Sequence, residues 1–294
     1  ALLAKADLIT DLVSEFPDLQ GIMGSYYAIN DGEPNEVAKG IRQQYLPNQS
    51  GGALPEGPIA CSVALADKID TLTGLFGIDH PPTGSKDPYA LRRQAIGVIR
   101  ICIENELDLD ISDCLNKSAE LYDKGYETET VRRYIIERLN SYYDDLGIGK
   151  DVVESASGEH LTALNLLSVN LVVLALSEFK DSPISESIVE VNKRVANILK
   201  KANLGDLPEV FDQRIAKEAV EIDLNNLVGE LNLGSISSVK DKLDALAKLQ
   251  GPVDRFFSIV MVMDDNRSIR NNRLCLLRDL RNKFLEVADF SLLQ

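Results

Sequence analysis

The residues with the most interpretable chemistry are four arginines near the end of the chain. They are Arg267, Arg270, Arg278 and Arg281. On a helix from residue 268 to residue 288, at about 100° per residue, they lie together on the flank of an apolar stripe. The stripe consists of Ile269, Leu277, Leu280, Phe284 and Val287. Guanidinium groups pair with phosphate and stack on nucleic-acid bases, so this pattern predicts binding to a polyanion.

The same arginines have a structural alternative. Asp264, Asp265 and Asp279 lie close to them in the sequence and could form ion pairs with them. Exposed ion pairs of this kind contribute little to stability. The residue pattern leaves both interpretations open.

A second basic group lies in the segment NKRVANILKKA, residues 192–202. It contains Lys193, Arg194, Lys200 and Lys201. Cations near the end of a helix interact favourably with the helix dipole, and they suit RNA equally well. Lys193 and Arg194 are therefore further candidates for RNA binding.

Three carboxylates in the first quarter of the chain raise the question of a metal site. They are Asp7, Asp67 and Asp70. The last two lie on a strongly apolar helix predicted over residues 59–76. Hydrolytic metal centres normally use imidazole ligands, and the chain has only His80, in the loop GIDHPPTG, and His160. We therefore expect no metal here, and we expect salt bridges to Lys5, Lys68, Arg92 or Arg93.

The sequence also offers no nucleotide-binding motif. The loop DHPPTGSKDP contains Gly-Ser-Lys, but its glycine spacing differs from that of a phosphate-binding loop and no strand precedes it. Asp87 and Pro88 instead predict the start of a helix over residues 88–104.

Composition sets the class of protein and the place of any RNA contact. The chain has 294 residues, 45% of them hydrophobic and 26% charged, which is typical of soluble globular protein. Its longest apolar runs, such as residues 171–176, are too short to span a bilayer, and four cysteines without a CxxC pair favour a reducing, cytoplasmic setting. The net charge of −15 is unusual for a nucleic-acid binder, so RNA contact must be local. Residues 251–290 are nearly charge-balanced, which favours that region.

Apolar residues recur at helical spacing throughout, and no alternating stretch of convincing length predicts a strand, so the expected fold is all-α. The start of the chain, ALLAKADLIT, lacks a helix cap and has the spacing of a helix in mid-course. It predicts a helix over residues 1–16 that is the cut edge of a longer protein. Gly21 and Gly24 predict close packing of the next helix against a neighbour.

The run VDRFFSIVMVMDDNRSIRNNRLCLLRDLRNKFLEVADFSLL closely resembles the C-terminal end of the β subunit of bacterial-type heterotetrameric (α2β2) glycyl-tRNA synthetase. Four other segments resemble the same subunit in the same order. They are AKADLITDLVSEFPDLQGIMGSYYA, ACSVALADKIDTLTGLFGI, PTGSKDPYALRRQAIGVIRI and NKRVANILKKA. The chain thus looks like the C-terminal portion of that subunit.

The resemblance implies three parts. Residues 1–106 are expected to form a degenerate HD-type helical domain, residues 107–158 a helical linker region, and residues 159–294 a helical-bundle anticodon-binding domain like that of arginyl-tRNA synthetase. Asp7 and either Asp67 or Asp70 would be vestiges of the acidic metal-binding positions of HD domains.

The resemblance also implies a function and partners. The chain would bind glycine tRNA and work with the α subunit, where ATP, Mg²⁺ and glycine meet, as part of a cytoplasmic glycine–tRNA ligase. This portion alone would bind no cofactor and be inactive. Two alternatives remain: an HD-like metal-dependent phosphohydrolase, and an acidic helical interaction scaffold.

Overall fold

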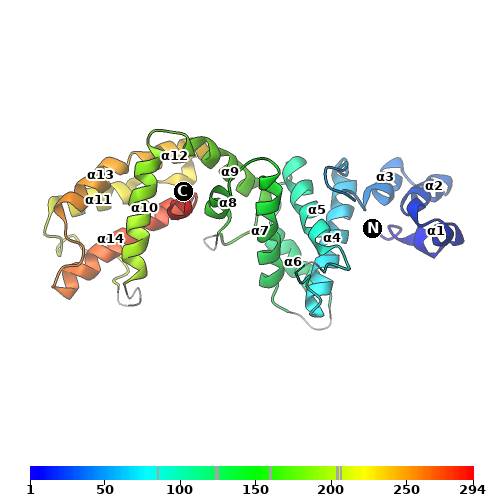
Figure 1. Ribbon diagram of the computed structural model, residues 1–294, viewed down its shortest axis with the longest axis horizontal. Helices are drawn as coiled ribbons and strands as arrows, with labels where there is room; N and C mark the ends of the chain where they lie inside the picture. Colours follow the sequence, from blue (N-terminus) through cyan, green and yellow to red (C-terminus); the bar gives the residue numbers. More distant parts are fainter. Residues whose placement is uncertain (85, 123–125, 159–160, 203–204, 206) are drawn as a thin grey trace. The chain divides into compact units, whose positions relative to one another are not determined.

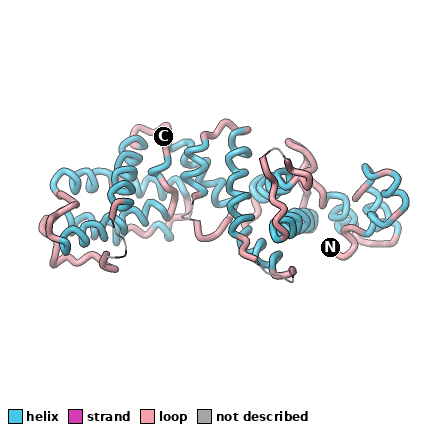
Figure 2. Tube along the Cα trace, turned by 60° about the horizontal axis from the view of Figure 1, so that its bottom comes forward, coloured by secondary structure: helices cyan, strands magenta, loops and turns pink. Residues whose placement is uncertain are grey.

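The computed structural model describes residues 1–84, 86–122, 126–158, 161–202, 205 and 207–294 (Figure 1). Within these ranges the chain consists of helices and loops, with two isolated bridges and no strand, as Figure 2 shows. The all-α class predicted from the sequence is confirmed for this part of the chain. His160 lies outside the described residues.

The chain divides into two compact units. The first comprises Ala1–Leu146 with Ala163–Ser168, and the second comprises Gly147–Thr162 with Val169–Gln294. The three functional parts expected from the sequence, with borders after residues 106 and 158, stay a prediction.

The first unit is built around one long apolar helix, α4 (Pro58–Gly77). Helix α4 packs against α3, α5, α6 and α7. Its Ala64 and Leu72 are fully buried, as is Tyr143 of α7. The helices of this unit are α1 (Asp11–Glu15), α2 (Ile22–Asn30), α3 (Asn35–Gln43), α4, α5 (Leu91–Glu104), α6 (Ile111–Ala119) and α7 (Glu129–Asp144), with 3-10 turns η1 (Ala6–Ile9) and η2 (Pro17–Leu19).

The single helix expected over residues 1–16 is wrong. The turn η1 and the short α1 are separated by Thr10, which has extended backbone geometry and whose hydroxyl accepts a hydrogen bond from the Val13 backbone N–H. Tertiary contact explains the break, because Asp7 is buried against α2 instead of continuing the helix outward.

The second unit is a bundle in which α14 (Arg267–Leu285) packs on α10 (Ser185–Lys200) and α11 (Ala219–Glu230). Phe290, just beyond α14, packs edge-on against the rings of Phe179 and Phe284. The other helices are α8 (Lys150–Ser157), α9 (Leu166–Lys180), α12 (Val239–Ala247) and α13 (Gln250–Ile259), with 3-10 turns η4 (Leu233–Ser235) and η5 (Phe290–Leu292).

Two features of this bundle differ from what the spacing of its apolar residues predicts. Residues 272–277 of α14 are buried on every side, so the middle of this helix has no solvent-facing arc. The segment before α11 has helical spacing but is not helical, because the Asn272 side chain holds Asp212 by accepting from its N–H at 2.8 Å and donating to its carbonyl at 3.0 Å. Across the described residues, no helix is long and apolar enough to cross a membrane.

Candidate functional site

The four arginines predicted to bind a polyanion all lie on α14, and Arg270, Arg278 and Arg281 make polar contacts within the chain. Arg278 bonds Asp279 through Nε at 2.9 Å and also donates to the carbonyls of Pro208 and Glu209 at 3.0 and 2.7 Å. These contacts match the alternative in which Arg278 pairs with a nearby carboxylate of the chain.

Arg281 and Arg270 are held in similar ways. Arg281 forms an ion pair with Asp289 at 2.8 Å, and Arg270 donates to the carbonyl oxygen of Asp264 at 3.1 Å. Arg267, the first residue of the helix, is exposed. A role for these four arginines in binding RNA stays a prediction.

A fifth arginine of α14, absent from the sequence-based set, lies at the centre of the bundle. Arg273 is 4% exposed and forms ion pairs with Glu221 at 2.9 Å and Asp264 at 3.1 Å. It also donates to the Met261 carbonyl at 3.0 Å, which fixes the loop leading into α14. A helical wheel indicates that Arg273 is buried, because it lies about 40° from Ile269, in the middle of the apolar stripe. An arginine there must be buried and paired.

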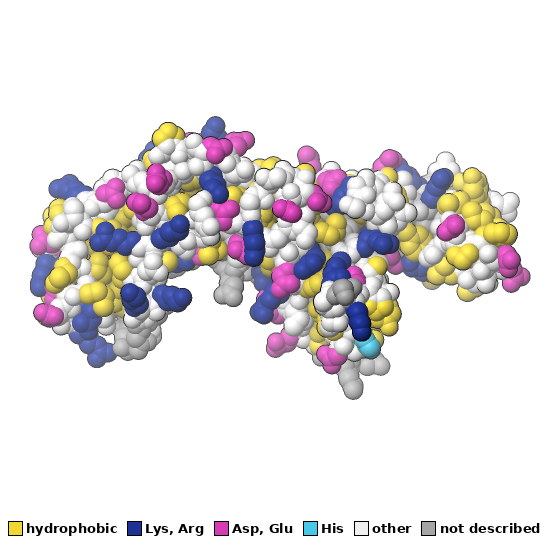
Figure 3. Space-filling view, in the orientation of Figure 1, with side chains coloured by type: hydrophobic (Ala, Val, Ile, Leu, Met, Phe, Trp, Pro, Cys, Tyr) yellow, Lys and Arg dark blue, Asp and Glu magenta, His cyan; other side chains and the backbone are white. Residues whose placement is uncertain are grey.

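The basic residues of α10 have a different environment from those of α14. Lys193, Arg194 and Lys200 lie on this helix and Lys201 follows it. In the part of the chain that the structure describes, none of the four has a carboxylate within ion-pair distance, whereas Arg278 and Arg281 do. On the face drawn in Figure 3, Lys and Arg side chains gather over α10.

Arg194 makes one recorded contact with an aromatic ring. Its guanidinium carbon lies 4.0 Å from the centroid of Phe257 on α13, within the range of a cation–π interaction. Arg194 is exposed and Phe257 is half-buried. The arrangement places an exposed cation over an aromatic ring.

The Asp7 side chain is buried in the first unit and hydrogen-bonded to its backbone. It is 1% exposed, and its Oδ2 accepts hydrogen bonds from the backbone N–H groups of Gly21 at 2.6 Å and Gly24 at 3.1 Å. It thus occupies the anion-binding end of α2 with a carboxylate of the chain itself. A Cβ on Gly24 would lie 2.8 Å from Ile41 Cγ2 and 2.9 Å from Asp7 Cγ. The close packing predicted for these glycines is confirmed.

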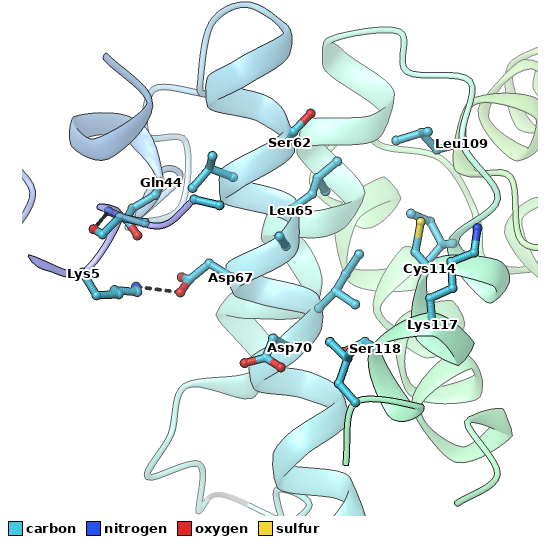
Figure 4. Close-up of a pocket in the computed structure, with 17 residues that line it drawn as sticks. Lys5, Gln44, Ser62, Leu65, Asp67, Asp70, Leu109, Cys114, Lys117 and Ser118 are labelled. Carbon is cyan, nitrogen blue, oxygen red and sulfur yellow. Dashed lines mark hydrogen bonds and ion pairs between the residues drawn. The ribbon is translucent and has the colours of Figure 1, made fainter. Parts of the chain in front are cut away.

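Asp67 and Asp70 line a largely apolar cavity of about 760 Å³ beside α4 and α6 (Figure 4). Asp67 forms an ion pair with Lys5 at 2.6 Å, which is one of the pairings the sequence predicted. Asp70 accepts a hydrogen bond from the Tyr122 hydroxyl at 2.8 Å.

These carboxylates do not fit a hydrolytic metal centre. Each already accepts from a donor of the chain, and His80 is exposed with its ring against Tyr89. Within the described ranges, no cluster of three or more His, Cys, Asp or Glu side chains is placed to hold an ion.

Lys68 is the other unusual group of α4. Its side chain is 2% exposed, and its ammonium makes one long hydrogen bond, 3.4 Å, to the carbonyl of Gln44. Burial lowers the pKa of Lys68 to about 8, although the nearby Asp67 acts in the opposite direction. A Cβ on Gly97 would lie 2.6 Å from Lys68 Cε, so a larger residue there would require the end of the Lys68 side chain to move.

These features define an all-α protein with a basic helix face in one unit and carboxylates bonded within the chain in the other. A family model described as glycyl-tRNA synthetase beta subunit matches residues 1–158. The chain belongs to this family.

Proteins named glycine–tRNA ligase beta subunit match the chain along its whole length. The protein of Colwellia psychrerythraea is 43% identical over 100% of this chain and 44% of its own length. Those of Marinobacter nauticus and Aeromonas hydrophila are 42% and 43% identical, again over all of this chain and 43% of their own length. The chain thus spans less than half the length of the curated relatives it matches.

Proposed function

We propose that this chain is the tRNA-binding part of a glycine–tRNA ligase β subunit and acts in glycyl-tRNA synthesis together with an α subunit. The observation that carries the proposal is the similarity to proteins of that name along the whole chain. In this proposal ATP, Mg²⁺ and glycine are handled by the α subunit. The present chain contributes RNA binding and no catalytic group.

The RNA surface that we propose is the basic face of α10 in the second unit. RNA binding depends on cations that are free to replace the counterions of phosphate. Lys193, Arg194, Lys200 and Lys201 meet this requirement better than Arg270, Arg278 and Arg281 of α14, each of which donates at least one hydrogen bond to another group of the chain. A local basic face also reconciles RNA binding with a net charge of −15.

Finer assignments follow from the same proposal. Residues 159–294 would recognise the anticodon region of glycine tRNA, and residues 1–106 would be an HD-like domain without hydrolase activity. The contacts of Asp7, Asp67 and Asp70 support a structural role for that domain's carboxylates.

The test uses the intact α/β enzyme. Replacing Lys193, Arg194, Lys200 and Lys201 together by Ala should weaken binding of a glycine tRNA transcript and lower the salt dependence of binding by about one unit of slope per lost phosphate contact. A matched variant removes four cations from the first unit, Lys39, Lys86, Lys117 and Arg133. Equal effects of the two variants, or none from the first, would contradict the α10 surface.

An acidic interaction scaffold is the competing function, because the charge of −15 also suits a protein partner. The same titration separates the two. If the chain is a scaffold, an enzyme that lacks residues 159–294 should bind tRNA as tightly as the wild-type enzyme. The proposed function requires the deletion to weaken tRNA binding.

A further inference from the structure

Two aromatic rings and one guanidinium, from two helices, are in contact at the surface of the second unit. Phe256 of α13 is fully buried, and its ring lies 5.3 Å from the ring of Phe257 at an angle of 73°. The guanidinium of Arg194 then covers Phe257 at 4.0 Å. Exposure rises from the buried Phe256 through the half-buried Phe257 to the exposed Arg194.

Arg194 differs from the other cations that lie over aromatic rings in the described residues. Lys5 lies over Tyr45 but also pairs with Asp67, and Arg138 lies over Tyr134 but also pairs with Glu137 at 3.7 Å. Arg194 has no carboxylate partner within the described ranges, and its residue is exposed. Its outer face and its N–H edge therefore remain open to a ligand.

The surroundings of Arg194 on α10 suit a nucleotide. Asn197 and Lys201 follow it at spacings of three and then four residues, so the three side chains form one stripe along the helix. Asn197 and Lys201 are exposed, and neither side chain forms a hydrogen bond or ion pair in the described part of the chain. The stripe offers a planar cation, then an amide with donors and an acceptor, then an ammonium, at a rise of about 1.5 Å per residue.

We propose that Arg194, which lies over the ring of Phe257, is a stacking platform for one unpaired base of the bound RNA, with the Asn197 amide facing the edge of that base and Lys201 facing a phosphate. Single-stranded RNA is recognised by bases stacked on aromatic or guanidinium planes combined with contacts to base edges. This inference rests on the proposed function and specifies how RNA would be read. It assigns to Phe257 a positioning role that acts through Arg194.

The experiment uses the intact α/β enzyme and glycine tRNA transcripts in which single loop nucleotides are replaced, one at a time, by the fluorescent base 2-aminopurine. Stacking quenches that fluorescence, so wild-type enzyme should quench one position. Arg194→Lys keeps the charge and removes the plane. We expect it to abolish the quench and weaken binding about 5-fold or more, with the salt dependence unchanged.

Two further variants complete the design. Phe257→Leu should also abolish the quench, and its folding is checked by thermal melting. Lys201→Ala removes a charge from the same stripe, so it should keep the quench and lower the salt slope by about one. Deleting the quenched base from the RNA should weaken binding to wild type but not to Arg194→Lys, because the two changes remove the same interaction.

The outcomes separate this inference from the proposed function. If Arg194→Lys keeps both the quench and the affinity of wild type, the platform is overturned while tRNA binding stands. If Arg194→Ala lowers the salt slope but Arg194→Lys has no effect, Arg194 contacts only phosphate, which also overturns the platform. If the enzyme that lacks residues 159–294 binds tRNA as tightly as the wild-type enzyme, the proposed function itself is wrong.

Discussion

Arg273 of α14 and Glu221 of α11 form an ion pair at 2.9 Å in which the two side chains are 4% and 0% exposed. Glu221 also accepts from the backbone N–H groups of Lys217 and Glu218, which caps α11. One buried carboxylate thus fixes a helix start and a partner helix together. Its second oxygen, Oε2, has no hydrogen-bond partner, so loss of Arg273 would leave a buried charge poorly compensated.

Arg273→Met should therefore lower the free energy of unfolding by about 3–5 kcal/mol, the range observed when one partner of a buried pair is removed. Urea unfolding followed by circular dichroism measures the change. The control is Arg214→Met, which removes the exposed pair with Asp212 and should cost much less. Similar losses for the two variants would contradict the importance of burial.

Gly24→Ala should destabilise the first unit by about 1–3 kcal/mol, because its Cβ would press on Ile41 and on the Asp7 carboxylate, which cannot move without losing two hydrogen bonds. Gly229→Ala, in α11, is the matched control. Nothing lies within 4 Å of a Cβ there, so that change should be neutral or slightly stabilising. Thermal melting of both variants decides the point.

Lys68→Met should stabilise the protein at pH 7 by about 3 kcal/mol, because it replaces a buried ammonium by an apolar chain of similar length. The pKa of Lys68 is about 8 in the folded chain and 10.5 is its ordinary value. The unfolded chain therefore binds more protons between these pH values, and wild-type stability rises with pH in that window. The stability difference between variant and wild type should shrink from pH 7 to pH 10.5. A difference that is constant with pH would contradict the assignment.

Arg278→Ala tests the two interpretations of the α14 arginines. Its guanidinium ties α14 to the carbonyls of Pro208 and Glu209, so we expect a loss of about 1–3 kcal/mol in unfolding free energy and unchanged tRNA affinity. A fall in affinity with unchanged stability would instead place Arg278 in the RNA surface. Arg267→Ala, at the exposed start of the same helix, is measured beside it.

Local sequence signals predicted those elements whose ends are fixed by their own residues. Asp87 was expected to cap a helix that starts at residue 88. The helix α5 starts at Leu91 instead, but the Asp87 carboxylate does accept from the N–H groups of Leu91 and Arg92. Ser238 likewise caps α12. By contrast, the helix expected over residues 1–16 is broken where Asp7 is buried, and the segment before α11 is held in a non-helical path by Asn272. The partners of these two side chains lie 14 and 60 residues away in the sequence. No local pattern contains that information.

The candidate site divides in the same way. The basic composition of α10 was visible in the sequence, whereas the stacking of Arg194 on Phe257 joins residues from helices far apart in the chain. The periodicity of α14 placed its arginines on one flank, but it could not indicate which of their donors the loop at residues 208–209 would occupy. Burial of Arg273 was readable from the wheel, and its partners were not.

The contact between Asp7 and Gly24 links the evolution of two positions that are 17 residues apart. A side chain at position 24 would need the space that the Asp7 carboxylate now occupies. A shorter residue at position 7 would leave the backbone N–H groups of Gly21 and Gly24 without their hydrogen-bond acceptor. Among relatives, Asp at position 7 and Gly at position 24 should therefore be gained and lost as a pair. A relative that keeps the aspartate beside a larger residue must carry its first helical turns in a different path.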